Sequence, residues 1–336
     1  MEATRVIELD WSDLELLCRT AIAAAGGNEA TAVALTDAVL AAERRGNTAV
    51  GVAHLIDYLN ALEEGRLNGS PQPVIRNGHR AVVAVTADDG IAQLAVHEAR
   101  ETLVAAAREC GVAVLSVSNC FPVGELGYYT SLLAEEGFVA LAGANSTALM
   151  SLFGAPKALT GTNPLSFAFP GQPPRLVDQA SSAVAWVKIR EAAEAGESIP
   201  SGWALDAEGK PTTDATAALL GPVLPFGGVK GSNLAMVIEL LAVLSGGQFS
   251  LDSPDFASGA DAPRVGMFLI ALDPTAFDPA YVSRAEVHFE RLRSEYDIDF
   301  GRYYRRVEQA AIPEHVHARL AKAVVRSAHV MRPLLP

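Results

Sequence analysis

The sequence predicts an α/β protein with a helical N-terminal region, and three observations support this fold class. Half of the 336 residues are hydrophobic, which is enough for a large core and favours two lobes. Apolar residues recur at helical spacing through the first quarter of the chain. From Val74 onward, short apolar runs typical of buried strands alternate with longer helical segments.

Residues 1–75 are expected to form the helical region, with helices over residues 12–26, 28–46 and 49–65. Ser12 and Glu15 have the spacing of a capping box, and two glycines end that first helix. Asn28 is a favourable N-cap for the second helix. In the third helix, apolar residues between positions 52 and 62 follow helical spacing.

Residues 76–309 are expected to form the α/β region. Strands are predicted at residues 81–86, 112–117, 138–142, 165–169 and 267–271, which are short apolar runs. Helices are predicted at 91–110, 129–136, 182–194, 233–244 and 283–295. A last helix at 314–330 lies in the segment 310–336, which is expected to pack with the helical region. Residues 65–78 and 257–264 are predicted to be surface connections.

Composition and charge exclude several function classes. The net charge of −13 disfavours nucleic acid and anionic membranes as partners, so a small-molecule substrate is expected. No apolar run is long enough to span a bilayer, and the N-terminus lacks a signal-peptide pattern, so we expect a cytoplasmic protein. The three cysteines lack paired spacing, which indicates neither a disulfide framework nor a metal site.

Four loops rich in Gly, Pro and small polar residues are the most informative feature of the chain, and they lie at residues 161–164, 178–182, 199–206 and 224–233. Such loops bring backbone N–H groups close to a ligand, which predicts a phosphate-bearing cofactor beside a polar substrate. No Gly-x-Gly-x-x-Gly turn follows a predicted strand. The nearest substitute is 227–231, where Lys230 precedes a helix expected to start at Ser232 and Asn233. This loop is either a phosphate site or only a helix cap.

These motifs together carry a family resemblance. Gly161-Thr162-Asn163-Pro164, then Ile-Pro-x-Gly-Trp-Ala-x-Asp at 199–206, then Gly-x-Lys-Gly at 228–231, occur in this order. The chain resembles the type-2 malate/L-lactate dehydrogenase family from about residue 44 to residue 306. Segments 224–228, 237–241 and 248–250 are similar to its Δ1-piperideine-2-carboxylate/Δ1-pyrroline-2-carboxylate reductase branch.

The resemblance implies a non-Rossmann NAD(P)-binding fold with a mixed, largely antiparallel sheet in residues 76–309. It also implies a homodimer whose active sites lie near the subunit interface. Lys230 aside, the cofactor contacts that it implies are Cys120, Phe121, Pro122, Val123, Gly124, Asp178, Gln179, Ala180, Gly301, Arg302, Arg305 and Arg306. The arginines of this tail fit a 2′-phosphate, which favours NADPH over NADH. The alternative for them is a solvated basic helix end.

The chain departs from the family at its catalytic motif, a Ser-His pair followed by an Arg four residues after the His. The aligned residues here are Ala49, Val50 and His54. A second family signature, His-Phe beside the cofactor, is Cys120-Phe121 in a segment two residues longer. Where the ketimine-reducing branch has Arg-Gly followed by an acid, this chain has Trp186, Val187 and Lys188.

These replacements favour one chemistry over another. Reduction of a ketone creates an alkoxide that a protein acid must protonate or stabilise, and valine cannot do so. A cyclic iminium already holds its proton, so hydride transfer neutralises it. We therefore expect an NAD(P)H-dependent reductase of a cyclic ketimine carboxylate. The alternatives are a 2-oxoacid/2-hydroxyacid dehydrogenase and a catalytically inactive relative that acts as a binding protein.

The candidate catalytic residues are His54, Lys188 and Thr162, and the candidate substrate contacts are His54, Thr162, Trp186 and Val187. Each has a structural alternative. His54 can be a helix histidine bonded to Asp57 or Tyr58, and Lys188 an ordinary surface lysine. Turn chemistry alone favours Thr162, and Trp186 can belong to a core or an interface. Asp178 is a candidate to contact the cofactor ribose or to orient the backbone that follows it, and its alternative role is to cap the following helix. Cys120 is expected to be a small packing residue.

Overall fold

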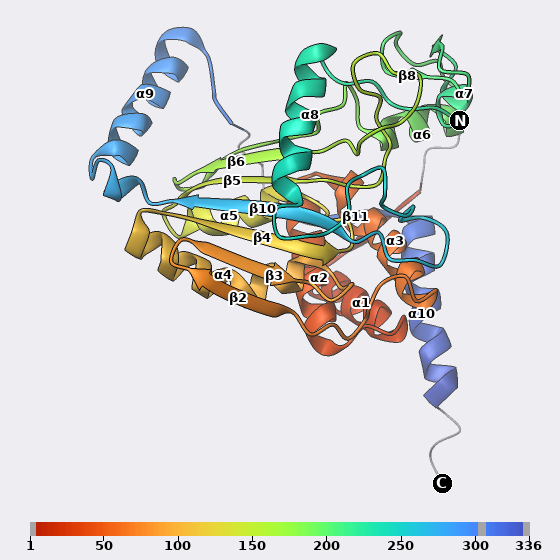
Figure 1. Cartoon of the computed structure of the whole chain (residues 1–336). Coiled ribbons are helices and arrows are strands. Elements are labelled where there is room, and N and C mark those ends of the chain that lie inside the picture. Colours follow the sequence, from red (N-terminus) through yellow and green to blue (C-terminus); the bar gives the residue numbers. More distant parts are fainter. Residues whose placement is uncertain (1–4, 302–306, 332–336) are drawn as a thin grey trace.

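A computed structural model describes residues 5–301 and 307–331 and is built on one seven-stranded sheet of order β2-β3-β4-β10-β5-β6-β7 (Figure 1). The only parallel pair in this described sheet is β3 with β4; its other neighbours are antiparallel. The mixed, largely antiparallel sheet is therefore confirmed. The strands are β2 (Val74–His79), β3 (Val82–Thr86), β4 (Val112–Cys120), β5 (Val139–Ala144), β6 (Leu165–Phe169), β7 (Arg175–Gln179) and β10 (Val265–Leu272).

Helices cover both faces of this sheet (Figure 1). Helices α4 (Ala92–Cys110) and α5 (Leu126–Glu135) pack on one face, where alternate strand residues such as Ala142 and Ala144 join their core. Helix α8 (Val229–Ala242) packs on the other face against β5 and β10. A Cβ at Gly143 would lie 2.5 Å from the Phe268 ring of β10 and 3.1 Å from Ile238 of α8, so the close packing on this face favours glycine.

The N-terminal helices pack with the C-terminal helix. Helix α1 (Trp11–Ala24) contacts α10 (Glu314–Met331), and β1 (Val6–Leu9) pairs with β11 (Ala310–Pro313). Helix α2 (Glu29–Arg44) leads through the 3₁₀ turn η1 (Thr48–Val50) into α3 (Val52–Glu63). These helices share a core with Ile312 and Leu320 from the other end of the chain. The division of the chain at residues 75 and 309 stays a prediction.

Two further parts stand above the sheet in Figure 1. A small lobe surrounds the N-terminal end of α8 and has its own core, which includes Met150, Ile189 and Val223. It contains α6 (Trp186–Ala195), β8 (Ala204–Leu205), β9 (Pro211–Thr212) and α7 (Ala215–Ala218). On the other side, α9 (Tyr281–Tyr296) follows the short turn η2 (Pro274–Ala276) and has no buried residue.

The cap predicted for the second helix is confirmed, and several other local predictions are wrong, among them the helix start at residue 182, because α6 begins at Trp186. Asn28 does cap α2, because its side chain accepts a hydrogen bond from the Thr31 N–H at 2.8 Å. The capping box at Ser12 is wrong, because α1 begins at Trp11 after Asp10. Helix α8 begins at Val229 after Gly228, so Ser232 is inside it rather than at its start. The predicted connection 65–78 ends early, because residues 74–79 form strand β2.

No helix within residues 5–301 and 307–331 has the length and apolar character needed to cross a membrane.

Candidate active site

Hydrogen bonds link the turn at 161–164 to the segment at 178–182. The Ser181 N–H donates to the Thr162 carbonyl at 2.7 Å, and the Ser181 hydroxyl donates to the Asn163 carbonyl at 2.7 Å. Asn163 has φ of 32°, a left-handed conformation that asparagine tolerates better than most residues. The turn is therefore fixed on its carbonyl side, and the half-buried Thr162 lies within it.

The glycine-rich loop at 224–231 is bonded to the same segment. The Phe226 N–H donates to the Ser181 carbonyl at 3.0 Å, and the Ala183 N–H donates to the Leu224 carbonyl at 2.7 Å. Gly227 and Gly228 have φ of 55° and 60°, and a Cβ at Gly228 would meet nothing within 4 Å. Their backbone is open to a ligand beside Lys230, which is exposed in the first turn of α8. These features fit a phosphate group of a dinucleotide.

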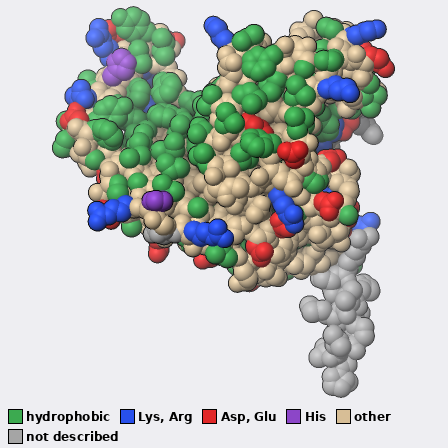
Figure 2. Space-filling model, viewed as in Figure 1, with side chains coloured by type: hydrophobic (Ala, Val, Ile, Leu, Met, Phe, Trp, Pro, Cys, Tyr) green, Lys and Arg blue, Asp and Glu red, His purple; other side chains and the backbone are tan. Residues whose placement is uncertain are grey.

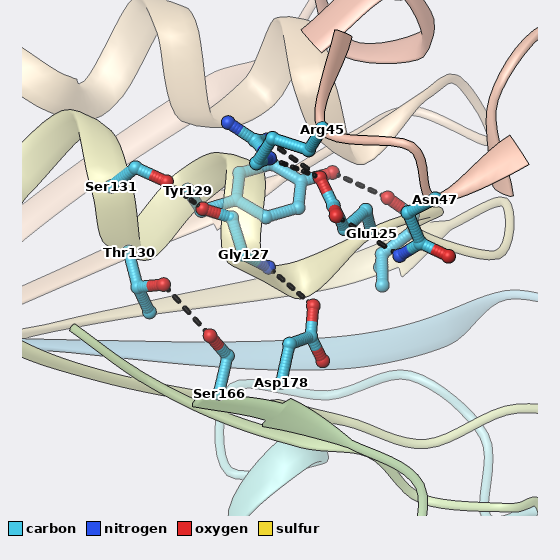
Figure 3. A network of polar contacts seen from close by, with 10 residues as sticks. Arg45, Asn47, Glu125, Gly127, Tyr129, Thr130, Ser131, Ser166 and Asp178 are labelled. Atoms are coloured by element: carbon cyan, nitrogen blue, oxygen red, sulfur yellow. Dashed lines mark hydrogen bonds and ion pairs between the residues drawn. The ribbon is translucent and has the colours of Figure 1, made fainter. Parts of the chain in front are cut away.

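The carboxylate of Asp178 connects this segment to the start of α5 (Figure 3). Its Oδ2 accepts a hydrogen bond from the Gly127 N–H at 2.7 Å, so it binds one of the unpaired N–H groups at that helix N-terminus. Of the three roles considered for Asp178, capping is therefore seen, but on the preceding helix α5 instead of the following one. Gln179 is exposed and Ala180 half-buried beside it.

Three buried polar side chains donate hydrogen bonds to backbone carbonyls of the segment 120–124. The Tyr58 hydroxyl donates to the Pro122 carbonyl at 2.6 Å, and the Tyr129 hydroxyl donates to the Val123 carbonyl at 2.7 Å. Gln93 donates to the same Val123 carbonyl at 3.1 Å. Burial raises the pKa of both tyrosines, so both stay protonated donors. Phe121 is buried and Gly124 half-buried in this segment.

A part-buried ion pair joins Glu125, directly after this segment, to Arg45, just before the altered catalytic motif (Figure 3). Arg45 lies 2.5 Å from Glu125 Oε2, and Asn47 donates to Glu125 Oε1 at 3.0 Å. Two residues earlier in the chain, Glu43 accepts a hydrogen bond from the Val52 N–H at 2.9 Å. A Cβ at Gly51 would lie 2.2 Å from the Glu43 carboxylate, so any larger residue there would displace that carboxylate from the Val52 N–H.

His54 lies on α3 and already has both of the partners proposed as its structural alternative. Its Nδ1 is 2.9 Å from Asp57 Oδ2, and its ring meets that of Tyr58 edge-on at 5.1 Å. Among residues 5–301 and 307–331, no hydrogen bond to its Nε2 is found. Ala49 and Val50 are half-buried in and beside the turn η1. A carboxylate-fixed imidazole whose second nitrogen can bind a ligand is compatible with substrate binding.

Cys120 is a packing residue rather than a reactive thiol. It is 1% exposed and donates to the Val265 carbonyl, and burial raises its pKa to about 12. A thiol with so high a pKa is almost entirely protonated at neutral pH. Its side chain therefore stabilises the fold beneath the proposed cofactor segment.

The remaining candidates lie on α6, beside β7 or outside the described residues. Lys188 is 60% exposed on α6 and pairs with Glu191 at 2.9 Å, so the structure presents it as a surface lysine. Trp186 packs against the core of the small lobe, and Val187 is half-buried beside it. Gly301 lies against Arg175 and Leu176 of β7, close to the Asp178 segment. Arg302, Arg305 and Arg306 lie outside the described residues.

Sequence reasoning missed two carboxylates that organise the site. Glu125 pairs with Arg45 and accepts a hydrogen bond from Asn47. Glu239 of α8 accepts five hydrogen bonds beneath the turn at 160–163. The only signal for Glu239 was a charged residue within the otherwise apolar run 235–244, which is uncommon unless the charge has partners.

Comparison with known proteins identifies the family. Residues 9–304 match the model of the family described as malate/L-lactate dehydrogenase. The chain belongs to this family. It is 39% identical over 275 residues to a Δ1-pyrroline-2-carboxylate/Δ1-piperideine-2-carboxylate reductase of Pseudomonas putida, covering 80% of each chain. It is 35% identical over 293 residues to a (2R)-3-sulfolactate dehydrogenase (NADP(+)) of Chromohalobacter salexigens, covering 86% of this chain and 87% of that one.

Solved structures agree with the fold. The Δ1-piperideine-2-carboxylate reductase of Pseudomonas syringae pvar. tomato superposes with a TM-score of 0.82 at 31% identity, covering 98% of this chain and 100% of that one. The sulfolactate dehydrogenase of Methanocaldococcus jannaschii gives a TM-score of 0.81 at 26% identity, covering 96% and 97%. This family member is an NAD(P)-dependent oxidoreductase that uses NAD(P)H, as predicted.

Proposed function

We propose that this protein reduces the C=N bond of a cyclic ketimine carboxylate and forms a cyclic amino acid. The observation that supports this choice is the pair Ala49 and Val50 at the positions aligned with the family's Ser-His pair. Neither side chain can donate a proton, and an iminium substrate does not require one. The similarity to reductases of this substrate class in Pseudomonas points the same way.

The chain's own residues are assigned to binding and orientation. When bound, reduced nicotinamide supplies a hydride to C2 of the substrate, and the C=N electron pair becomes the lone pair of the amine. Thr162, in its fixed turn, donates a hydrogen bond to the substrate carboxylate, and His54 Nε2 supplies a second contact. Lys188 can contact the substrate carboxylate only if it breaks its ion pair with Glu191. Trp186 and Val187 are proposed as apolar contacts of the ring.

NADPH is proposed as the preferred form of the cofactor. Lys230 and the open glycines beside it bind one phosphate, and Arg302, Arg305 and Arg306 bind the 2′-phosphate in an otherwise acidic protein. Segments 120–124 and 178–180, with Gly301, complete the proposed contacts. A second candidate function, 2-oxoacid reduction, is supported by the similarity to sulfolactate dehydrogenases.

A direct assay separates these two functions. The purified protein is given Δ1-piperideine-2-carboxylate, Δ1-pyrroline-2-carboxylate, pyruvate or sulfopyruvate, each with NADPH and with NADH. We expect the cyclic imines to be reduced and NADPH to give the higher kcat/KM. Turnover of the oxoacids alone would establish the second candidate function. Failure to bind either nicotinamide cofactor, followed by fluorescence, would instead favour an inactive binding protein.

We also propose that two copies associate through apolar faces that this chain exposes. Hydrophobic side chains gather over α9 and across the hollow between α9 and α8 (Figure 2). Val287 and Tyr296 of α9 are 71% and 59% exposed, and Val237 and Leu240 of α8 are 52% and 55% exposed. Monomeric proteins seldom expose so much apolar surface together, which supports a homodimer with this face as its interface.

A further inference from the structure

We propose that Glu239, in the middle of α8, is a positioning residue that fixes the turn at residues 160–163 for substrate binding. The inference rests on the proposed function, because it concerns the turn to which substrate binding by Thr162 is assigned. It adds a residue and a mechanism that the sequence motifs did not indicate. Glu239 is 4% exposed and is therefore too deeply buried to touch the substrate itself.

Five hydrogen bonds converge on the Glu239 carboxylate. Its Oε2 accepts from Thr160 Oγ1 at 2.9 Å, from Asn163 Nδ2 at 2.7 Å and from Ser250 Oγ at 2.7 Å. Its Oε1 accepts from the Ser250 N–H at 2.6 Å and from Asn145 Nδ2 at 3.4 Å. Two of these donors, Thr160 and Asn163, belong to the turn itself.

The charge of Glu239 explains why these donors are held in place. Among residues 5–301 and 307–331, the ion pairs found include none to Glu239, so hydrogen bonds alone compensate its burial. A carboxylate has room for about four good hydrogen bonds, which here are the four of 2.9 Å or less, and leaving them unmade in a buried site is costly. Any displacement of Thr160 or Asn163 would remove donors from a buried carboxylate. The turn is therefore held in one geometry.

The turn is held from two sides, with Thr162 between them. Beneath it, Asn163 Nδ2 also lies 2.8 Å from Thr160 Oγ1 and 2.9 Å from the Ala235 carbonyl, so its two hydrogens are shared among these oxygens and Glu239. Beside it, Ser181 donates to the carbonyls of Thr162 and Asn163. These contacts compensate the left-handed backbone of Asn163. The side chain of Thr162 has no hydrogen bond within the described parts of the chain, which leaves it available for a carboxylate.

A double-mutant cycle tests whether Glu239 acts through Thr162. The wild type, Glu239→Gln, Thr162→Val and the double variant are compared by kcat/KM for Δ1-piperideine-2-carboxylate with NADPH. In Glu239→Gln, the amide NH₂ replaces an acceptor oxygen and faces side chains that are themselves donors. The turn should therefore shift, and we expect kcat/KM to fall about tenfold or more. The double variant should lose no more than about threefold beyond the worse single variant, because the two residues act on one contact. The Kd for NADPH should stay within threefold of the wild type.

Independent effects would overturn the proposal. If Glu239 stabilises only the fold, the losses of kcat/KM in Glu239→Gln and Thr162→Val multiply in the double variant. The same is expected for the matched control, Asp273→Asn combined with Thr162→Val. Asp273 is also a buried carboxylate, but it pairs with Arg108 at 2.8 Å and directly follows the last residue of β10. Thr160→Val removes one donor without changing a charge. It should show the same coupling to Thr162 if Glu239→Gln fails to fold.

The design also separates failure of this proposal from failure of the proposed function. If the wild type reduces only sulfopyruvate, the imine function fails and the same cycle is measured with sulfopyruvate, which also has a carboxylate. If imines are reduced but the losses multiply, the function stands and the role of Glu239 falls. If no substrate turns over, calorimetric binding of L-pipecolate with NADP⁺ replaces kcat/KM, and absence of binding overturns both.

Discussion

At the scale of single residues, the proposed choice of chemistry rests on position 50. Val50 ends the turn η1, and its N–H donates to the Asn47 carbonyl at 3.2 Å, so the backbone there is ordered without a polar side chain. His54, four residues later in α3, has its Nδ1 on Asp57 and is oriented by that contact. The chain thus keeps an imidazole near the motif while having lost the proton donor at the aligned position.

Restoring the missing acid gives the first prediction. Val50→His should raise kcat/KM for 2-oxoacids by about tenfold or more, since a positioned general acid contributes at least that much. Reduction of cyclic imines should change little, because the iminium nitrogen already holds its proton. Spectrophotometric assays of both substrate classes measure the ratio. Val50→Ala is the control and should give no gain, and an equal gain for imines would contradict the prediction.

The three cysteines give the second prediction. Cys18 and Cys120 are 0% and 1% exposed, and burial raises the pKa of each to about 12, whereas Cys110 is exposed at the end of α4. At pH 8 a thiol with such a pKa is about one ten-thousandth ionised. A thiol reagent such as DTNB should therefore titrate one cysteine in the native protein and three in denaturant. Cys110→Ser should abolish the native reaction; a second fast thiol would disprove the burial argument.

At the scale of elements, the site depends on contacts between the ends of secondary structures. The Arg45–Glu125 pair joins the C-terminal end of α2 to the N-terminal end of α5, and Asp178 joins the end of β7 to that same helix end (Figure 3). Both contacts lie beside the segment 120–124. They set the distance between the altered motif and the proposed cofactor contacts.

Breaking this pair gives the third prediction. Removing one charge from a buried ion pair costs about 3–5 kcal/mol, and the 18% exposure of Arg45 reduces our expectation for Glu125→Gln to about 2 kcal/mol. Urea unfolding measures this loss of stability, and fluorescence should show weaker NADPH binding. Glu136→Gln is the matched control, because Glu136 pairs with Arg100 near the other end of α5 and is 34% exposed. Its cost should stay below about 1 kcal/mol. Equal effects of the two variants would argue against a special role for Glu125.

At the scale of the whole molecule, exposed apolar surface determines the expected assembly. Helix α9 has no buried residue. It meets the sheet through Phe169, whose ring contacts Tyr281 and Phe289, and through Arg175, which pairs with Glu286 and lies over the Phe289 ring. Other apolar side chains of α9, including Val287 and Tyr296, stay exposed in a single chain. Its apolar residues are better explained as part of an interface with a second copy.

A charge placed on this face gives the fourth prediction. Val287→Asp should convert the dimer into monomers, because a desolvated carboxylate without a partner disfavours association. Size-exclusion chromatography with light scattering should give twice the mass of one chain for the wild type and the mass of one chain for the variant. Leu16→Asp, at an α1 residue that is 66% exposed, is the control and should remain dimeric. A monomeric wild type would refute the assembly.

The sequence alone determined the elements whose signals are local. The apolar runs of β3 to β6 and β10 and the long helix α4 could be predicted within a few residues, because side-chain periodicity reports burial. The Gly161–Pro164 turn, the 199–206 segment and the 228–231 loop were enough to predict the family and its use of NAD(P)H, which comparison confirmed.

The tertiary structure decided what depends on partners far apart in the chain. Strand β7 was missed because its five residues lack a strong apolar run and depend on pairing with β6. The capping of α5 by Asp178 and the bonding of Glu125 to Arg45 join residues 51 and 80 positions apart, and Glu239 is bonded to a residue 79 positions away. Local periodicity has no information about such pairs, because a buried polar group is satisfied by whichever donor the fold brings to it.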